Sequence, residues 1–113
     1  MSLEAMLEMT AGGVAKIQLK GKLDAGTADD FQKRIEEAAG HKAQRIVLLM
    51  EGLTFMASAG LRTLIFAKQK MGATVDIYVI GAQTQVIETL EMTGLNHSVV
   101  IRDIYDPAEI EKV

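Results

Sequence analysis

The chain has no cysteine, so disulfides and thiolate metal sites are excluded. It has no apolar run near the roughly 18 residues that a membrane-spanning helix needs, and its N-terminus lacks a basic segment followed by an apolar one. We therefore expect no direct membrane insertion, no secretory signal and retention in the cytoplasm. The net charge of −3 provides no basic face of the kind that nucleic acid requires.

Proline and low-complexity sequence are scarce as well, which bears on domain organisation. The only proline is Pro107, and no repeat or linker-like segment interrupts the chain. With 113 residues, of which 49% are hydrophobic and 24% charged, the chain is long enough to bury a core. We expect a single domain over residues 1–113.

Histidine is rare, and no catalytic or metal-binding constellation can be assembled from the sequence. His41 and His97 lie in separate predicted turns without acidic or cysteine companions at ligand spacing, which is typical of exposed turn residues. The string around Ser58 is Met-Ala-Ser-Ala-Gly and lacks the Gly-x-Ser-x-Gly pattern of a nucleophile elbow. A P-loop is absent too. The sequence thus predicts a protein that works by binding, with no enzymatic activity, cofactor or metal.

One stretch, residues 45–71, organises the rest of the chain. It opens with the apolar run Ile46–Met50, which has the length of a strand buried on both faces. A turn is predicted at Glu51-Gly52, followed by a short apolar piece. Small residues then lead into helical spacing, so a helix is expected from Ser58 to Met71, with the Ser58 hydroxyl capping its first turn.

The flanking segments alternate between strand-like and helix-like patterns. Residues 3–9 and 14–20 carry apolar residues at every second position with glycines between them, as in a β-hairpin, and a loop follows at 21–26. The further expected elements are a helix capped by Thr27, a strand over Thr74–Ile80, a helix over Gln83–Thr93, a strand at Val99–Ile101 and a short helix opened by Asp106 and Pro107. This order predicts an α/β fold, with a mainly parallel sheet of four to five strands, an N-terminal hairpin and helices packed mostly on one face. The strand order is left open.

Three motifs occur along the chain in a fixed order. They are Ile-x-Leu-x-Gly-x-Leu-Asp-Ala at 17–25, Gly-Leu-Thr-Phe-Met-x-Ser-Ala-Gly-Leu at 52–61 and Thr-Gly-Leu at 93–95. Together they resemble the STAS domain family, whose founding members are bacterial anti-sigma-factor antagonists, over about residues 3–105. The resemblance implies a STAS-like fold and a partner that is an anti-sigma factor with serine kinase activity. It also implies that Ser58 is the phosphorylated residue and that phosphorylation breaks the complex.

The same resemblance implies a partner-binding surface around Ser58, with an apolar contact area near Met56 and Leu61. The expected members of this surface are Asp24, Met56, Ala57, Ser58, Ala59, Gly60 and Leu61. Because the carboxyl ends of parallel strands share one edge of a sheet, Asp24 and Ser58 are expected at the same end of the domain. Family members carry an acid directly before the acceptor and another near the end of the buried strand, where this chain has Ala57 and Leu49.

Alternatives stay open for the main residues and for the domain as a whole. Ser58 is either a helix cap alone or a phosphorylation site, and Asp24 is either a turn residue or part of the site. The domain is either an anti-sigma-factor antagonist or an unphosphorylated accessory or ligand-binding STAS domain of a lipid or anion transporter complex. The sequence also leaves a homodimer open, and it does not name the partner.

Overall fold

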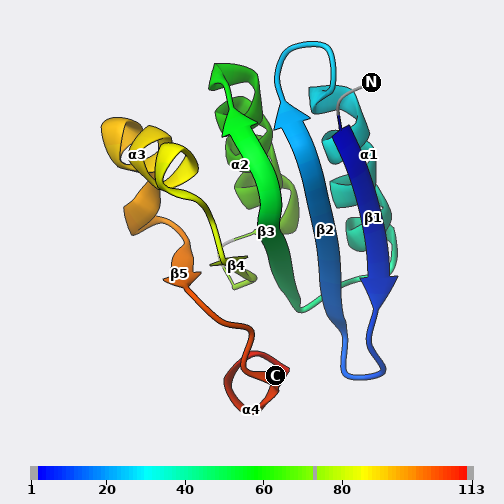
Figure 1. Ribbon diagram of the computed structural model, residues 1–113. Helices are drawn as coiled ribbons and strands as arrows, with labels where there is room; N and C mark the ends of the chain where they lie inside the picture. The colour runs from blue at the N-terminus through cyan, green and yellow to red at the C-terminus, as the bar shows by residue number, and fades with distance from the viewer. Residues whose placement is uncertain (1–2, 73, 112–113) are drawn as a thin grey trace.

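The computed structural model describes residues 3–72 and 74–111, and in these ranges the chain forms a five-stranded sheet with four α-helices (Figure 1). The elements in chain order are β1 (Leu3–Met9), β2 (Val14–Leu23), α1 (Ala28–Gly40), β3 (Arg45–Met56), α2 (Ser58–Met71), β4 (Asp76–Ile80), α3 (Thr84–Thr93), the 3-10 helix η1 (Leu95–His97), β5 (Val100–Arg102) and α4 (Pro107–Ile110). This is the α/β domain that the sequence predicts. Within the described ranges, none of the helices has both the length and the apolar character to cross a membrane.

The strands lie side by side in chain order, β1-β2-β3-β4-β5, which settles the order that the sequence left open. β1 pairs with β2 in antiparallel fashion, and every later neighbour pair is parallel. Each crossover therefore moves one strand in the same direction, and right-handed crossovers then place their helices on one face of the sheet. Figure 1 shows α1 and α2 behind the sheet, with β3 in its middle.

The core lies between the sheet and the first three helices. Its largest fully buried members on the strands include Ile17, Leu19, Ile46, Leu48 and Met50, and the helices add Phe31, Ile35, Leu64, Val86 and Leu90. A second, smaller cluster occupies the opposite face and consists of Val14, Val47, Tyr78, Ile80 and Ile110. The apolar run at the start of β3 thus contributes to both faces, as predicted for a central buried strand.

The predicted turn at Glu51-Gly52 is wrong, because β3 continues through it to Met56. The predicted loop at 21–26 starts too early for the same reason, since β2 runs on to Leu23 and pairs with the second half of β3. Two register shifts along this pair insert extra residues into β3, so the strand continues through Glu51 and Gly52 and stays paired with β2. The strands β4 and β5 also begin later than expected, at Asp76 and Val100.

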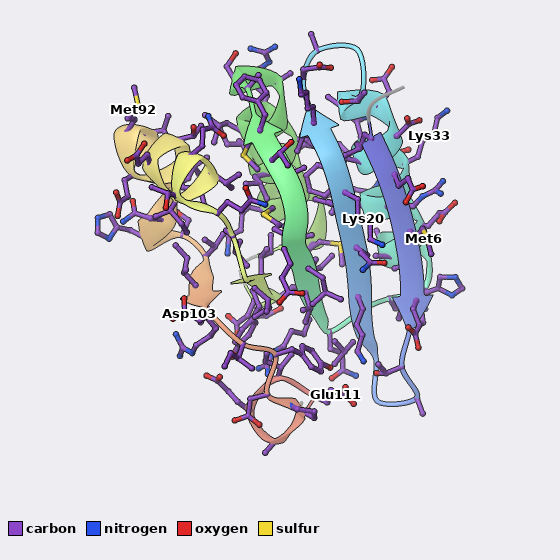
Figure 2. All side chains as sticks on the ribbon, viewed as in Figure 1. Met6, Lys20, Lys33, Met92, Asp103 and Glu111 are labelled. Carbon is purple, nitrogen blue, oxygen red and sulfur yellow. The ribbon has the colours of Figure 1, made fainter. Side chains whose placement is uncertain are left out.

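The outer face of the hairpin is polar where no helix covers it. Met6 and Lys20 project from this face in Figure 2, and Met6 is 58% exposed. In the register of the hairpin, Glu4 lies opposite Lys20 and Glu8 lies opposite Lys16. Opposite charges across a strand pair stabilise the hairpin modestly.

The terminal helix α4 covers part of the outer face farther along the sheet. The Arg45 guanidinium donates a hydrogen bond to the carbonyl oxygen of Ile110 at 3.0 Å, and Lys16 Nζ lies 3.0 Å from Glu111 Oε2. The Tyr105 hydroxyl also donates to the Glu111 carboxylate. The hydrogen bond from Tyr105, followed by that from Lys16, holds the pKa of Glu111 below its ordinary value.

Candidate functional site

Two loops meet at one end of the sheet, at the top of Figure 1, where β2 and β3 end. Leu23 and Met56 are partners in the parallel register, and the Ala57 amide donates to the Leu23 carbonyl oxygen at 2.9 Å. Asp24 follows β2 directly, and Ser58 begins α2 after β3. The two residues therefore lie on adjacent loops at the carboxyl ends of parallel strands, as predicted.

Ser58 is the first residue of α2 and its side chain is exposed. The prediction that it caps the helix is wrong, because Ala57 occupies the N-cap position with extended backbone angles (φ −95°, ψ 177°) and no side chain caps the turn. The amides of Ser58 and Ala59 have no intrahelical acceptor, since they lie in the first turn. The hydroxyl therefore sits free of a capping role, at the positive end of the helix dipole, where an added anion is stabilised.

Several residues expected to form the contact surface are buried in the core. Met56 is 1% exposed, Ala59 6% and Leu61 7%. Gly60 is buried as well, and a Cβ added there would lie 2.8 Å from the Leu23 side chain and 2.9 Å from that of Met56. The small residues thus let α2 approach the sheet closely, and Ala59 and Gly60, which were expected on the contact surface, are buried residues of α2. Of the expected set, Ser58 is exposed, and Asp24 and Ala57 are half-buried.

Asp24 shapes the loop between β2 and α1. Its Oδ1 accepts a hydrogen bond from the Gly26 amide at 3.0 Å and lies 3.2 Å from the Thr27 hydroxyl. Thr27 occupies the N-cap position of α1 as predicted, but its hydroxyl donates to the Lys22 carbonyl oxygen at 2.9 Å and does not cap the first turn. The turn interpretation of Asp24 therefore has direct structural support.

An exposed stripe along α2 begins at Ser58. Arg62 and Ile65 follow it at spacings of four and three residues, which place them on the same helix face, and Ile65 is 43% exposed. Phe55, which is 39% exposed, lies three positions before Ser58, near the end of β3. Sequence reasoning missed Arg62 and Phe55, although helical spacing counted from Ser58 would have pointed to the arginine.

A groove of about 250 Å³ separates the beginnings of α1 and α2 beside this stripe. The groove is lined by Ala25, Ala28, Asp29, Gln32, Ala59, Arg62 and Thr63. Its charged members are Asp29 and Arg62, one acid and one base, so the groove itself is close to neutral. Arg62 thus borders both the groove and the Ser58 stripe.

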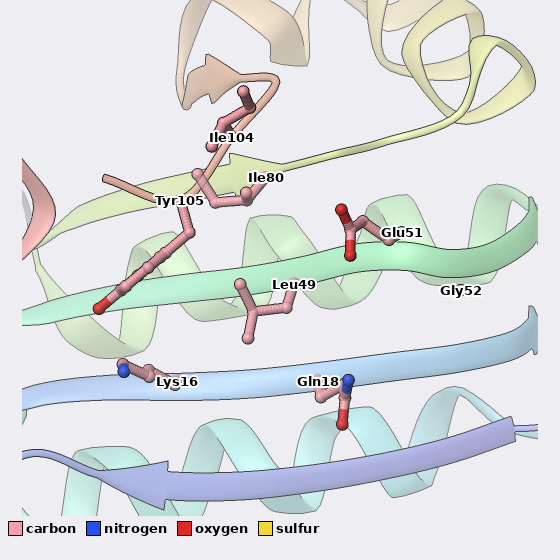
Figure 3. Close-up of a pocket in the computed structure, with 8 residues that line it drawn as sticks. All are labelled: Lys16, Gln18, Leu49, Glu51, Gly52, Ile80, Ile104 and Tyr105. Atoms are coloured by element: carbon pink, nitrogen blue, oxygen red, sulfur yellow. The ribbon is translucent and has the colours of Figure 1, made fainter. Parts of the chain in front are cut away.

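A second hollow, of about 360 Å³, lies on the face of the sheet opposite α1 and α2 (Figure 3). It is lined by Lys16, Gln18, Leu49, Glu51, Gly52, Ile80, Ile104 and Tyr105. Leu49 lies at its centre in Figure 3 and pairs with Gln18 and Ile80 across the sheet. Leu49, where the family resemblance leads us to expect an acid, makes the centre of this hollow apolar and lies well before the Ser58 end of the strand.

The described residues hold no cluster of three or more histidine, aspartate or glutamate side chains that could bind a metal. The site at the end of β3 consists instead of one exposed hydroxyl, one guanidinium and two partly exposed apolar side chains. This composition suits contact with another macromolecule.

Comparison with known proteins agrees with this architecture. The STAS domain family model matches residues 9–108, and the chain belongs to the STAS domain family. The anti-sigma-F factor antagonist RsfB of Mycobacterium tuberculosis is 25% identical over 84 residues, which are 74% of this chain and 69% of RsfB. The chain is thus distantly similar in sequence to an anti-sigma factor antagonist.

Solved structures share the fold. An anti-sigma factor antagonist from Mycobacterium paratuberculosis has a TM-score of 0.84 at 21% identity, covering 95% of this chain and 91% of the other. SpoIIAA in its unphosphorylated form has a TM-score of 0.78 at 21% identity, covering 93% and 92%. The Bacillus SpoIIAA in its phosphorylated form has a TM-score of 0.71 at 20% identity, covering 93% and 96%.

Proposed function

We propose that this chain is an anti-sigma factor antagonist that binds an anti-sigma factor with serine kinase activity through the surface around Ser58. The observation that carries the proposal is the exposed Ser58 hydroxyl at the first turn of α2, in a chain of the STAS family. Phosphorylation of Ser58 switches the complex off. RsfB and SpoIIAA, which are anti-sigma factor antagonists, support this assignment by their similarity to the chain.

The contact surface comprises Phe55, Ser58, Arg62 and Ile65, with Asp24 and Ala57 at its margin. Ile65 is apolar, partly exposed and on the same face of α2 as Ser58, so a partner that covers this face also covers Ser58. A phosphate brings about −1.5 to −2 charges, and burying such a group beneath a partner without further basic residues is costly.

In the free chain the phosphate is tolerated. Ser58 lies at the positive end of α2, and Arg62 follows it by one helical turn, a spacing that lets a guanidinium reach a phosphate on Ser58. Phosphorylation should therefore weaken the complex while it changes the fold little. The similarity of this chain to both forms of SpoIIAA supports a fold that accommodates the modified state.

Ala57 sets this chain apart from family members that have an acid before the acceptor. We expect the kinase to phosphorylate Ser58 slowly, and Ala57→Asp to raise the rate measured with a family kinase. An unchanged rate would show that the acid at this position does not contribute to recognition by the kinase.

The test of the switch is calorimetric. Each anti-sigma factor kinase encoded in the source genome is purified and titrated with the wild-type chain, Ser58→Ala and Ser58→Asp. Ala11→Asp is the control, because Ala11 is exposed in the turn before β2, at the other end of that strand from Asp24, and the variant adds the same charge there.

We expect Ser58→Asp to bind at least about tenfold more weakly, a change of about 1.4 kcal/mol, while Ser58→Ala and Ala11→Asp bind as the wild type does. Equal affinities of Ser58→Ala and Ser58→Asp would rule out the switch and leave an unswitched binding module. Failure of every anti-sigma factor to bind the wild type would overturn the proposed function.

The hollow on the face of the sheet opposite α1 and α2 favours one second candidate, an accessory STAS domain that binds a small amphiphile within a lipid or anion transporter complex. Its apolar lining of Leu49, Ile80 and Ile104 beside Lys16 and Gln18 suits such a ligand. Titration with anilinonaphthalene sulfonate tests it. Saturable one-to-one binding that Leu49→Asp abolishes would support this candidate, and the absence of saturable binding would remove it.

A further inference from the structure

The second half of β3 lacks a neighbouring strand on the side toward β4. The register between these strands runs from Arg45 paired with Asp76 to Leu49 paired with Ile80. After Ile80 the chain turns away at Gly81, with φ of 70°, and enters α3. β3 nevertheless continues to Met56 with β2 on its other side. Backbone amides and carbonyls on that edge therefore have no strand to pair with, and the Met56 amide among them is only partly exposed to water.

Two glutamine side chains at the start of α3 provide hydrogen-bond partners on this edge. Gln83 Nε2 donates to the Glu51 carbonyl oxygen at 2.9 Å. Gln85 Oε1 accepts from the Met56 amide at 3.0 Å, and Gln85 Nε2 lies 3.4 Å from the Met56 carbonyl oxygen. One carboxamide thus meets both backbone groups of a single residue. A carboxamide has the same donor and acceptor as a peptide group, so it can replace a strand partner.

The orientation of the Gln85 carboxamide is itself determined by its helix. Gln85 Nε2 donates to Thr89 Oγ1 at 3.0 Å, and the Thr89 hydroxyl donates to the Gln85 carbonyl oxygen at 2.9 Å. Since that hydroxyl already uses its proton, it can only accept from the side-chain amide. The oxygen of the carboxamide is thereby directed toward the Met56 amide.

Met56 is the last residue of β3 and stands two positions before Ser58. Its side chain is 1% exposed, and the next amide, that of Ala57, is held by the Leu23 carbonyl oxygen from the β2 side. The backbone that leads into Ser58 is therefore fixed from two directions, by β2 and by Gln85 of α3. Loss of one of these contacts leaves the start of α2 less constrained.

We propose that Gln85 is the positioning residue of the Ser58 site: its carboxamide holds the Met56 backbone and so sets where the Ser58 hydroxyl is presented to a partner. The part of this inference that concerns the partner rests on the proposed function, whereas the part that concerns the backbone does not. Gln85 acts through the backbone and does not contact the serine.

Amide hydrogen exchange by NMR tests the backbone part on the chain alone. Gln85→Ala removes both contacts to Met56, Gln85→Glu keeps the shape and the acceptor for the Met56 amide, and Gln83→Ala is a matched control at the same helix end. We expect Gln85→Ala to speed exchange of the Met56 amide about tenfold, as loss of one hydrogen bond predicts. Amides of Ile46 and Leu48, deeper in the same strand, should keep their rates.

The conservative variant separates a specific contact from a general loss of helix stability. Gln85→Glu should restore protection of the Met56 amide, because its carboxylate accepts the same hydrogen bond. Gln83→Ala should leave Met56 unchanged. Unchanged Met56 exchange in Gln85→Ala, or equal acceleration along all of β3, would overturn the proposal.

The effect of Gln85 on partner binding is tested by measuring the affinity of Gln85→Ala for the anti-sigma factor that binds the wild type. We expect weaker binding with a slower association, while the melting temperature changes little. Wild-type affinity in a variant whose Met56 exchange has risen would overturn the link to Ser58. If no anti-sigma factor binds the wild type, the proposed function fails, and the exchange measurement alone decides the role of Gln85.

Discussion

A single added methyl group at Gly60 tests how closely α2 lies on the sheet. Gly60 is within the first turn of α2, and a Cβ there would lie 2.8 and 2.9 Å from Leu23 side-chain atoms and 2.9 Å from Met56 Cγ. Carbon atoms in favourable contact are about 3.5–4.0 Å apart. Leu23 and Met56 are 0% and 1% exposed, so neither side chain has free space to move into.

Two opposing effects set the stability of Gly60→Ala. Alanine is better than glycine in a helix by up to about 1 kcal/mol. Overpacking of a well-filled core costs about 1–3 kcal/mol. Because three contacts at one site are too short and the atoms involved are fully buried, we expect overpacking to dominate, with a net loss of about 1–2 kcal/mol of unfolding free energy. For a domain of this size the melting temperature should fall by about 4–8 °C.

The matched control is Gly40→Ala at the end of α1, where an added Cβ meets nothing within 4 Å. This variant should be neutral or stabilised by up to about 1 kcal/mol, because it gains helix propensity without a clash. Urea unfolding monitored by circular dichroism gives both free energies. A Gly60→Ala variant as stable as the wild type would refute the packing argument and return Gly60 to the residues that could admit a partner.

Three further predictions follow from burial and charge. Met56→Ala should lower the unfolding free energy, measured in urea, by about 2–5 kcal/mol. Phe55→Ala should lower it much less and should weaken partner binding. Equal losses of unfolding free energy in the two variants would contradict the burial of Met56. Arg62→Gln should change the unfolding free energy of the unmodified chain by less than about 0.5 kcal/mol. In the chain phosphorylated at Ser58 it should lower the melting temperature, because the phosphate loses the cation one helical turn away. An unchanged melting temperature would speak against that ion pair. The pKa of Glu111 is lowered in the folded chain. The contribution of its carboxylate to the unfolding free energy is therefore complete above pH 4.5, the ordinary pKa, and is lost as the pH falls through the pKa of the folded chain. The protection factors of amides in α4, which are corrected for the intrinsic pH dependence of exchange, should therefore fall on acidification, and Glu111→Gln should remove this fall.

Local patterns in the sequence were sufficient for the kinds of element and much of their extent. The helix from Ser58 to Met71 was predicted with the bounds observed, because small residues precede a regular helical spacing. The short terminal helix was also predicted, and the Asp106 side chain accepts a hydrogen bond from the Ala108 amide there. Such features depend on residues within a few positions of one another, so a single sequence contains the information.

The family, and the placement of Asp24 and Ser58 at one end of the sheet, could also be predicted from the sequence. The motif around Ser58 and the motif that ends at Asp24 each follow a predicted strand, and parallel strands bring such positions together. Which side chains face outward at that end was not predictable, and Met56 and Leu61 were placed wrongly on the surface.

Only the tertiary structure decided those orientations. β3 continues past Gly52 because β2 pairs with it, and the register shifts along this pair determine which of its last residues enter the core. The contact of Gln85 with Met56 joins residues far apart in the chain, and so does the hollow over Leu49. A local pattern determines an element and its apolar face, whereas the register between elements determines what each side chain finally touches, and that register depends on all the strands at once.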